Sequence, residues 1–141
     1  MKTNKFEDLY EFKCNPILID RLEKMVYVFA HQLSEGEYKS GLWKSIKVEK
    51  EENIFWYFEL NSNETWEIVS DNYISDNKIS TKCFSLLAFS FALNYLMSEI
   101  YEDENSKELL DEIIELYYAI RDNLDVLLDE REKQIFYKVT D

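Results

Sequence analysis

The sequence predicts an α+β domain with an N-terminal helix, a three- to four-stranded antiparallel meander, and two to three C-terminal helices packed on the sheet. Three observations support this prediction. Apolar residues recur at helical spacing over residues 16–36, short aromatic and β-branched segments separated by polar turns fill residues 42–74, and long apolar or amphipathic stretches follow. At 141 residues the chain is expected to be one domain, 1–141, in which residues 1–14 are a candidate N-terminal arm.

The first helix has both a start and a stop signal. Asn15 is a suitable N-cap, and Pro16 suits the first helical position because its missing N–H would have no partner there. Gly36 is a suitable stop. The residues predicted to face inward are Leu18, Leu22, Met25, Val26, Phe29 and Leu33.

The strands are predicted from the segments "LWKSIKVEK", "NIFWYFEL", "TWEIVS" and "NYIS", joined by a turn over 49–53 and by "NSNE". Alternation along the second strand sends Phe55 and Tyr57 to one face and Trp56 and Phe58 to the other. Because both faces carry aromatic residues, we expect this strand to be mostly buried. In the alternative interpretation, one aromatic face is exposed as a contact surface.

The remaining chain is predicted to be helical. Ser80 or Thr81 caps "KCFSLLAFSFALNYLMSEIYE", which is apolar almost all round and is therefore expected to be buried against the sheet. Asn105 or Ser106 caps the next helix, and Ile135 and Phe136 face inward from a last short helix in "DEREKQIFYKV". The inward residues of the middle helix are expected to be Leu109, Ile113, Leu116, Tyr117, Ile120 and Leu124.

The chain is strongly acidic, with a formal net charge of −13. Such a charge repels nucleic acid and anionic membranes and attracts basic protein surfaces, so we expect neither direct nucleic-acid binding nor membrane binding. The longest apolar run, about 14 residues, is shorter than the roughly 20 that a membrane span needs. The start "MKTNKFEDLY" is not a signal peptide, and Cys14 and Cys83 have no metal-like spacing, so a cytoplasmic location is expected.

Residues suited to catalysis are few. His31 is the only histidine, and its place near a helix C-terminus indicates a capping or surface role. Gly36 and Gly41 form neither a phosphate-binding loop nor a dinucleotide fingerprint, so no cofactor is expected. The carboxylates lack the histidine partners of an E-x-x-H motif, so no metal is expected either. An enzyme is not predicted; the alternative from that class is a thiol-dependent enzyme that uses Cys14 or Cys83 with His31.

Acidic residues follow helical spacing on the outer side of the predicted 105–128 helix. Residues 99–141 contain 14 acidic and 5 basic residues, so most of the net charge lies in the last third of the chain. A row of carboxylates about 4.5–6 Å apart along a helix is comparable with the spacing of phosphates along nucleic acid. Such a face could occupy a basic groove of a partner, although charge runs are more often solvated helix faces. The residues of this acidic face are Glu108, Asp111, Glu112, Glu115 and Asp122.

Two motifs resemble the ArdB/KlcA antirestriction family of plasmids and phages, small proteins that relieve type I restriction. The first motif, "YKSGLW", consists of Tyr38, Ser40, Gly41, Leu42 and Trp43. The second, "FELNSNETW", consists of Phe58, Glu59, Leu60, Ser62, Asn63 and Trp66. The order of elements and the "YYAIRDNL" helix are also similar. This chain differs from the family pattern in the insertion "KSIKVEKEENIFWY" and in Asn63 and Glu64, which replace two turn glycines.

The resemblance implies a small intracellular inhibitor of a host defence nuclease, with restriction enzymes as the first expected target and CRISPR effectors as the second. It implies no catalytic residues. We expect contact with a basic surface of the partner through the acidic face, and weaker contacts from the loops at Ser40, Gly41, Trp43, Asn61, Asn63 and Glu64. The runner-up is an immunity protein that neutralises a nuclease toxin by the same charge complementarity. The oligomeric state stays open.

Overall fold

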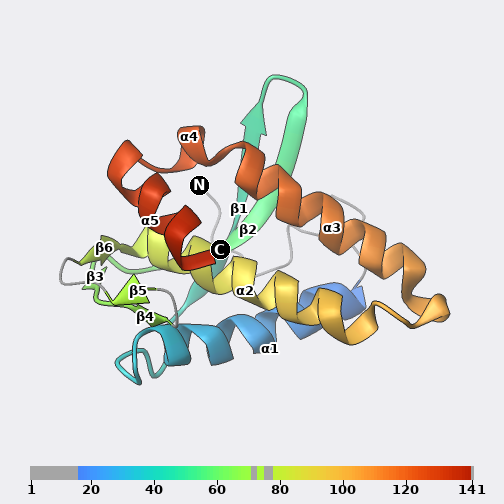
Figure 1. Cartoon of the computed structure of the whole chain (residues 1–141), viewed down its shortest axis with the longest axis horizontal. Helices are drawn as coiled ribbons and strands as arrows, with labels where there is room; N and C mark the ends of the chain where they lie inside the picture. The colour runs from blue at the N-terminus through green and yellow to red at the C-terminus, as the bar shows by residue number, and fades with distance from the viewer. Residues whose placement is uncertain (1–15, 71–72, 75–77, 141) are drawn as a thin grey trace.

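A computed structural model describes residues 16–70, 73–74 and 78–140, and its fold is α+β (Figure 1). The helices are α1 (Pro16–Leu33), α2 (Thr81–Ile100), the 3₁₀ turn η2 (Glu104–Ser106), α3 (Lys107–Asp122), α4 (Leu124–Leu127) and α5 (Glu130–Thr140). The strands are β1 (Trp43–Lys50), β2 (Asn53–Leu60), β3 (Thr65–Trp66), β4 (Val69–Ser70), β5 (Tyr73–Ile74) and β6 (Ile79–Ser80). The predicted order of helix, antiparallel strands and helices is therefore confirmed.

The strands of the described residues form three antiparallel pairs rather than one continuous meander: β1 with β2, β3 with β6, and β4 with β5. The chain leaves the β1–β2 ladder after Leu60, and the segment predicted as one strand over residues 65–70 divides into β3 and β4. Trp66 of β3 stacks on Phe84 of α2, which holds β3 beside the start of α2 instead of beside β2. Packing of this large ring thus favours the position of β3 in which it pairs with β6.

The β1–β2 hairpin has a two-residue connection, in which Lys50 pairs with Asn53. The turn predicted over 49–53 is therefore present, although it contains no glycine. Glu51 supplies the backbone conformation that such short hairpins need, with φ of 56°. At the other end of the ladder, Trp43 pairs with Leu60.

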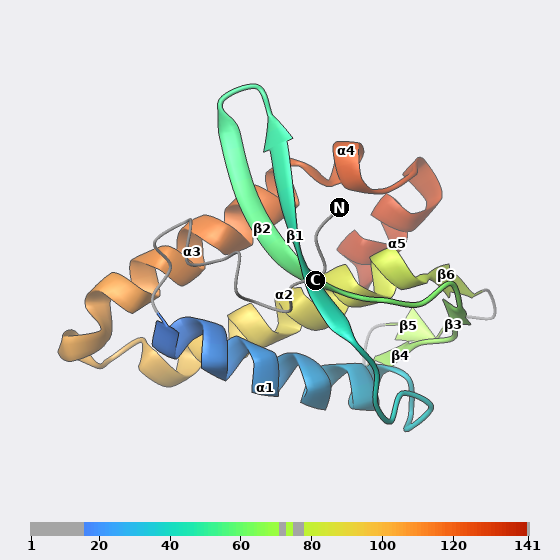
Figure 2. The ribbon, with the colours of Figure 1, turned by 180° about the vertical axis from the view of Figure 1, so that it is seen from behind.

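Helix α2 is the centre of the molecule and contacts α1, β2, α3 and α5. Figures 1 and 2, which show opposite sides, both place α2 between α1 and α3. Its length and composition would allow it to cross a membrane, but most of the helix is buried inside the protein, as in the core helix of a globular fold. The helix continues to Ile100, about one turn beyond the apolar run counted in the sequence and within the segment predicted to be helical.

The aromatic run of β2 is buried on both faces, as expected. Phe55, Trp56, Tyr57 and Phe58 are 4%, 5%, 0% and 0% exposed, respectively. Phe89 of α2 contacts three of these rings, with centroid distances of 5.6 Å to Trp56, 6.5 Å to Tyr57 and 5.3 Å to Phe58. The run is therefore core, and the alternative of an exposed aromatic platform is wrong.

Helix termini agree only in part with the sequence signals. The backbone N–H of Gly36, whose φ is 88°, donates to His31 O at 2.8 Å, which confirms the predicted stop of α1. Ser80 is the N-cap of α2 and accepts from the backbone N–H of Cys83 at 3.1 Å. Asn15 lies outside the described residues.

The inward residues of α1 are as predicted, except that Met25 and Phe29 are only partly buried, while Ile19 and Ala30 are buried.

The start of α3 lies where it was predicted, with Ser106 at the N-cap position, but Ser106 makes no side-chain capping hydrogen bond. Asp103 instead accepts from the backbone N–H of Asn105 at 3.0 Å and from Ser106 Oγ at 2.9 Å, at the start of η2. The predicted inward residues of this helix are buried, apart from the half-buried Tyr117. The helix itself ends at Asp122, and a separate short helix α4 follows.

Helix α5 is held to the start of α2 by a buried carboxylate. Glu132 accepts from the backbone N–H of Ser80 at 2.7 Å and from Ser80 Oγ at 2.8 Å. Toward the C-terminal end of α5, the guanidinium of Arg121 lies 5.4 Å from the ring centroid of Tyr137 and donates to Thr140 Oγ1 at 2.9 Å. The predicted inward residues, Ile135 and Phe136, are both buried.

Candidate interaction surfaces

Both motifs behind the family resemblance contribute to a buried aromatic cluster, the motif cluster, formed by Tyr38, Trp43 and Trp66. Trp43 Nε1 donates to Tyr38 Oη at 2.8 Å, and the backbone N–H of Tyr38 donates to Ser34 Oγ at 2.8 Å. Burial raises the pKa of Tyr38. The three rings hold the α1–β1 loop and β3 against one another. The role of these residues is therefore to stabilise the fold rather than to contact a partner.

Trp66 has the most constrained position in the motif cluster. Its ring stacks on Phe84 at a centroid distance of 4.5 Å and an interplanar angle of 8°. Its Nε1 donates to Thr81 Oγ1 at 3.0 Å, and that hydroxyl donates to Glu64 O at 2.6 Å. This chain of hydrogen bonds fixes the loop before β3 on the first turn of α2.

The structure brings together the two loops that were predicted as weaker contacts. The backbone N–H of Asn61 donates to Leu42 O at 2.8 Å, so the loops run side by side beyond the end of the β1–β2 ladder. Five of the six predicted loop residues are exposed, namely Ser40, Gly41, Asn61, Asn63 and Glu64. Trp43 is only 2% exposed, which corrects its assignment as a surface contact.

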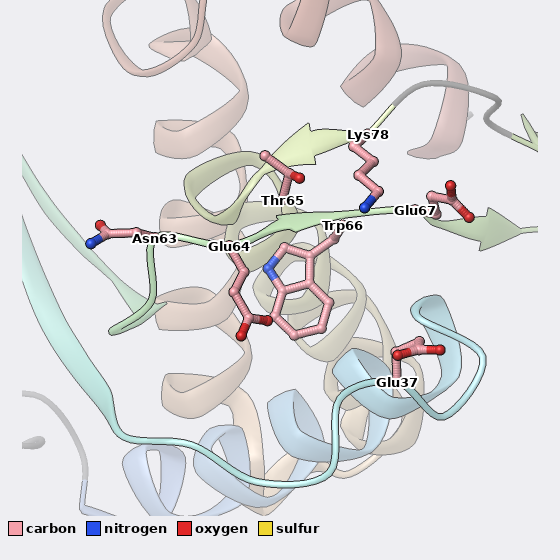
Figure 3. A pocket seen from close by; sticks show the side chains of 7 residues that line it. All are labelled: Glu37, Asn63, Glu64, Thr65, Trp66, Glu67 and Lys78. Carbon is pink, nitrogen blue, oxygen red and sulfur yellow. The ribbon is translucent and has the colours of Figure 1, made fainter.

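An open pocket of about 590 Å³ lies beside these loops (Figure 3). Sequence reasoning identified Asn63 and Glu64 here but missed Glu37, Glu67 and Lys78. Glu37 and Lys78 are distant in sequence from this loop, and the pairing of β3 with β6 is what brings Lys78 to the pocket. Three carboxylates and one ammonium group line the pocket, so its own lysine offsets part of its negative charge.

The acidic face of α3 is largely on the surface. Glu108, Asp111, Glu115 and Asp122 are exposed, whereas Glu112 is half-buried. At 100° per residue the five positions fall within an arc of roughly 100° around the helix axis. Glu108 lies in the first turn, where a carboxylate interacts favourably with the helix dipole. The expected row of carboxylates is therefore possible on this helix, and its role as a contact surface stays a proposal.

One edge of the acidic face borders a second hollow, the β2–α3 groove, of about 300 Å³. Strand β2 contributes Ile54, Phe55 and Trp56, and helix α3 contributes Glu112, Glu115, Leu116 and Ala119. The groove combines an apolar floor with two carboxylates. Sequence reasoning identified the carboxylates but not the floor, because nothing in the sequence places β2 beside α3.

Of the residues suggested for thiol chemistry, Cys83 and His31 lie within the described part of the chain, and each contacts a backbone carbonyl there. Cys83 is buried, its Sγ lies 4.0 Å from Glu132 O, and burial raises the pKa of its thiol far above the ordinary value, with Glu132 adding to the effect. His31 is exposed at the end of α1, where its Nδ1 lies 3.0 Å from Tyr38 O. Cys14 lies outside the described residues. Within those residues there is no group of three or more potential metal ligands.

The arrangement of elements places the chain in a class of small α+β proteins with a central apolar helix and a short antiparallel hairpin. No family model and no curated protein matches the sequence. A search of solved structures finds a protein from work on KlcA and ArdB, described as having a novel fold and antirestriction activity against type I DNA restriction systems in vivo but not in vitro. The TM-score is 0.72, the match covers 100% of both chains, and sequence identity is 20%. The resemblance drawn from the two motifs is thus confirmed for the fold.

Proposed function

We propose that this protein is an antirestriction-type inhibitor, which relieves the action of a host defence nuclease by binding to it rather than by catalysis. The single observation that supports this most is the full-length likeness to the KlcA and ArdB structure, at a TM-score of 0.72. A likeness over the full length of both chains is more informative than a match to a few helices would be. The first target we expect is a type I restriction enzyme.

The acidic face is the proposed contact surface. A nuclease that acts on DNA carries basic grooves, because phosphate contacts supply most of its affinity for nucleic acid. A chain with a net charge of −13 is attracted to such grooves over long range. The carboxylates of the acidic face then compete for the positions that phosphates would occupy, and the exposed loop residues Ser40, Gly41, Asn61, Asn63 and Glu64 add weaker contacts.

The test is phage plating on cells, because the related protein is active in vivo but not in vitro. Unmodified phage is plated on a host with a type I restriction system, with and without expression of this protein. We expect plating to rise by orders of magnitude with the protein, and to stay constant for modified phage or for a host without the system. Unchanged plating of unmodified phage would overturn the type I assignment. The same strain design with a CRISPR effector, or with an expressed nuclease toxin, then tests the other targets.

Charge reversal tests the acidic face itself. Replacing Glu108, Asp111, Glu112 and Glu115 by Lys is expected to abolish the gain in plating, because each reversal turns an attraction into a repulsion at the proposed interface. The matched control reverses four exposed acids elsewhere, so that the net charge changes equally: Glu35, Glu52, Glu102 and Glu130. Full activity of the first variant, or equal loss in both, would contradict the proposed surface.

A further inference from the structure

A third hollow, the α1 pocket, differs in charge from the pocket beside β3 and from the β2–α3 groove. Its volume of about 490 Å³ lies in the range of small-molecule sites. None of its described lining residues is acidic, although the chain has a net charge of −13. Its chemistry comes from the C-terminal half of α1 and from the loop that leads to β1 (Figure 2), namely from Tyr27, Val28, His31, Lys39, Ser40 and Gly41.

His31 is held in one orientation by the turn that follows α1. Its Nδ1 lies 3.0 Å from Tyr38 O, and a carbonyl oxygen only accepts, so Nδ1 carries a proton. The backbone N–H of Gly36 donates to His31 O at 2.8 Å, which closes the turn over the same residue. Functional histidines are commonly fixed in this way, with one ring nitrogen bonded to a backbone carbonyl and the other facing the ligand. Nε2 of His31 makes no hydrogen bond to the described residues and is therefore open to a ligand.

The loop after α1 adds donors that have no partner in the described part of the protein. Lys39 is exposed and its ammonium group forms no ion pair there, whereas Lys24 on α1 is paired with Asp20. The backbone N–H groups of the exposed Ser40 and Gly41 make no hydrogen bond to the described residues either. Ammonium, imidazolium and peptide N–H groups are the donors that hold anions in proteins. A phosphate group, with three strong acceptor oxygens, suits such a set of donors.

The rest of the lining offers apolar surface. Val28 is 44% exposed on α1. The ring of Tyr27 is fixed from two sides, because its Oη donates to Glu23 Oε1 at 3.0 Å and its centroid lies 6.1 Å from that of Trp43. The carboxylate of Glu23 is held by this bond and does not line the pocket. A fixed ring beside an exposed aliphatic side chain suits the apolar body of an organic ligand.

We propose that the α1 pocket binds a small organic phosphate, of which an aromatic phosphate monoester is the simplest example. The phosphate group accepts from Lys39 Nζ, from the loop at Ser40 and from Nε2 of the His31 imidazolium, while the body of the ligand packs on Tyr27 and Val28. The proton on Nε2 is taken up from solvent, and Nδ1 donates to Tyr38 O in either protonation state, so the ring keeps its orientation. This inference goes beyond the antirestriction role and does not depend on it, because the acidic face is not part of the pocket.

The experiment titrates the isotope-labelled full chain with phenyl phosphate, inorganic phosphate, phenol and benzoate, followed by nuclear magnetic resonance. His31 is the only histidine of the chain, so its imidazole resonances are identified without ambiguity. We expect phenyl phosphate to shift these resonances and the amide resonances of Ser40 and Gly41. It should bind about tenfold more tightly than inorganic phosphate, because its ring adds apolar contact. Phenol or benzoate binding as tightly as phenyl phosphate would overturn the assignment of a phosphate ligand.

Two variants test the donors. Lys39→Gln is expected to weaken phenyl phosphate binding about tenfold, because it removes a charge-assisted hydrogen bond. His31→Gln keeps an amide donor for Tyr38 O but cannot become cationic, and a similar loss is expected. The matched control Lys78→Gln removes the same charge at an exposed lysine of the pocket beside β3 and should change binding less than about twofold, since its field is screened. Equal effects of Lys39→Gln and Lys78→Gln would overturn the site, even if His31→Gln proved to be unfolded.

Val28→Ser tests the apolar part of the site separately. It should reduce the preference for phenyl phosphate over inorganic phosphate about threefold, because only apolar contact is lost, and leave the affinity for inorganic phosphate unchanged. Val126→Ser on α4, where the native side chain is 48% exposed, is the control and should change neither affinity. A preference that Val28→Ser leaves intact, or resonance shifts confined to residues outside the α1 pocket, would contradict the proposed site.

Discussion

The motif cluster and the acidic face differ in almost every physical respect. Tyr38, Trp43 and Trp66 are buried and joined by hydrogen bonds and ring contacts, whereas four of the five acidic-face residues are exposed. The cluster carries the resemblance to known antirestriction proteins, yet it has no surface to offer a partner. A likeness in such residues therefore reports the fold, and the specificity of the protein has to come from surface residues that the motifs do not include.

The largest effect is expected inside the motif cluster. Trp66→Ala removes a ring stacked on Phe84 and leaves Thr81 Oγ1 without its indole donor. We expect the free energy of unfolding to fall by about 3–5 kcal/mol, the usual cost of truncating a buried aromatic residue. Urea denaturation measures the loss, and Thr65→Ala, an exposed neighbour on β3, is the control. A loss below about 1 kcal/mol would mean that the cluster is not decisive for the fold.

The role of Trp66 also explains how far the fold could be predicted. Helical spacing located α1 and α3, a long apolar stretch behind a capping residue located α2, and the aromatic and β-branched content located β1 and β2. The pairing of β3 with β6 was not predictable, because it depends on Trp66 stacking on a residue 18 positions later rather than on any pattern within the strands. The cap of η2 was missed because Asp103 lies before the residues whose spacing indicated a helix start.

The core aromatics also predict a dependence on alkaline pH that the acidic face does not share. Burial raises the pKa of Tyr57 far above its ordinary value, and Glu59 adds to this effect by its charge and by accepting from Tyr57 Oη at 2.6 Å. The folded state keeps this proton above pH 10, where the unfolded chain loses it. Stability is therefore fully present below about pH 10 and falls above it, by about 1.4 kcal/mol per pH unit for this tyrosine.

Tyr57→Phe is the test of that pH dependence. Denaturation at pH 8 and at pH 11 should show a smaller loss of stability between the two pH values for the variant than for the wild type. Phe58→Leu, a change in the same strand without a titrating group, should leave that difference unchanged. An identical pH dependence in all three proteins would show that folding does not raise the pKa of Tyr57.

The candidate surfaces were predictable from the sequence only where all their residues lie on one helix. Spacing on one helix is sufficient to align the acidic face, because α3 fixes those positions locally. The groove requires β2 to lie beside α3, and the pocket beside β3 requires residues 37, 64, 67 and 78 to converge. Such long-range contacts leave no local signal. Trp43 was misassigned because an aromatic residue next to a glycine loop looks the same in sequence whether it is exposed or buried.

Gly41 belongs to the first motif and lies close to Tyr38 and Leu60, and a moderate effect is expected there. A Cβ atom at this position would lie 2.5 Å from Leu60 Cδ1, so alanine forces the buried Leu60 side chain to move. We expect Gly41→Ala to lower the free energy of unfolding by about 1 kcal/mol, the low end for overpacking. Ser40→Ala, at the exposed neighbour, should be neutral. A neutral Gly41→Ala would mean that Leu60 adjusts without cost and that this glycine is not needed for packing.

The smallest effect on stability is expected where the effect on function is expected to be largest. Reversing Glu108, Asp111, Glu112 and Glu115 to Lys removes a favourable helix-dipole interaction at Glu108 but relieves repulsion in a chain of net charge −13. These terms oppose each other, so the free energy of unfolding should change by no more than about 0.5 kcal/mol. Thermal and urea unfolding measure it beside the plating assay. If the variant loses activity and stability together, the carboxylates serve the fold; if activity alone is lost, a separate contact surface on the shared fold is the explanation that remains.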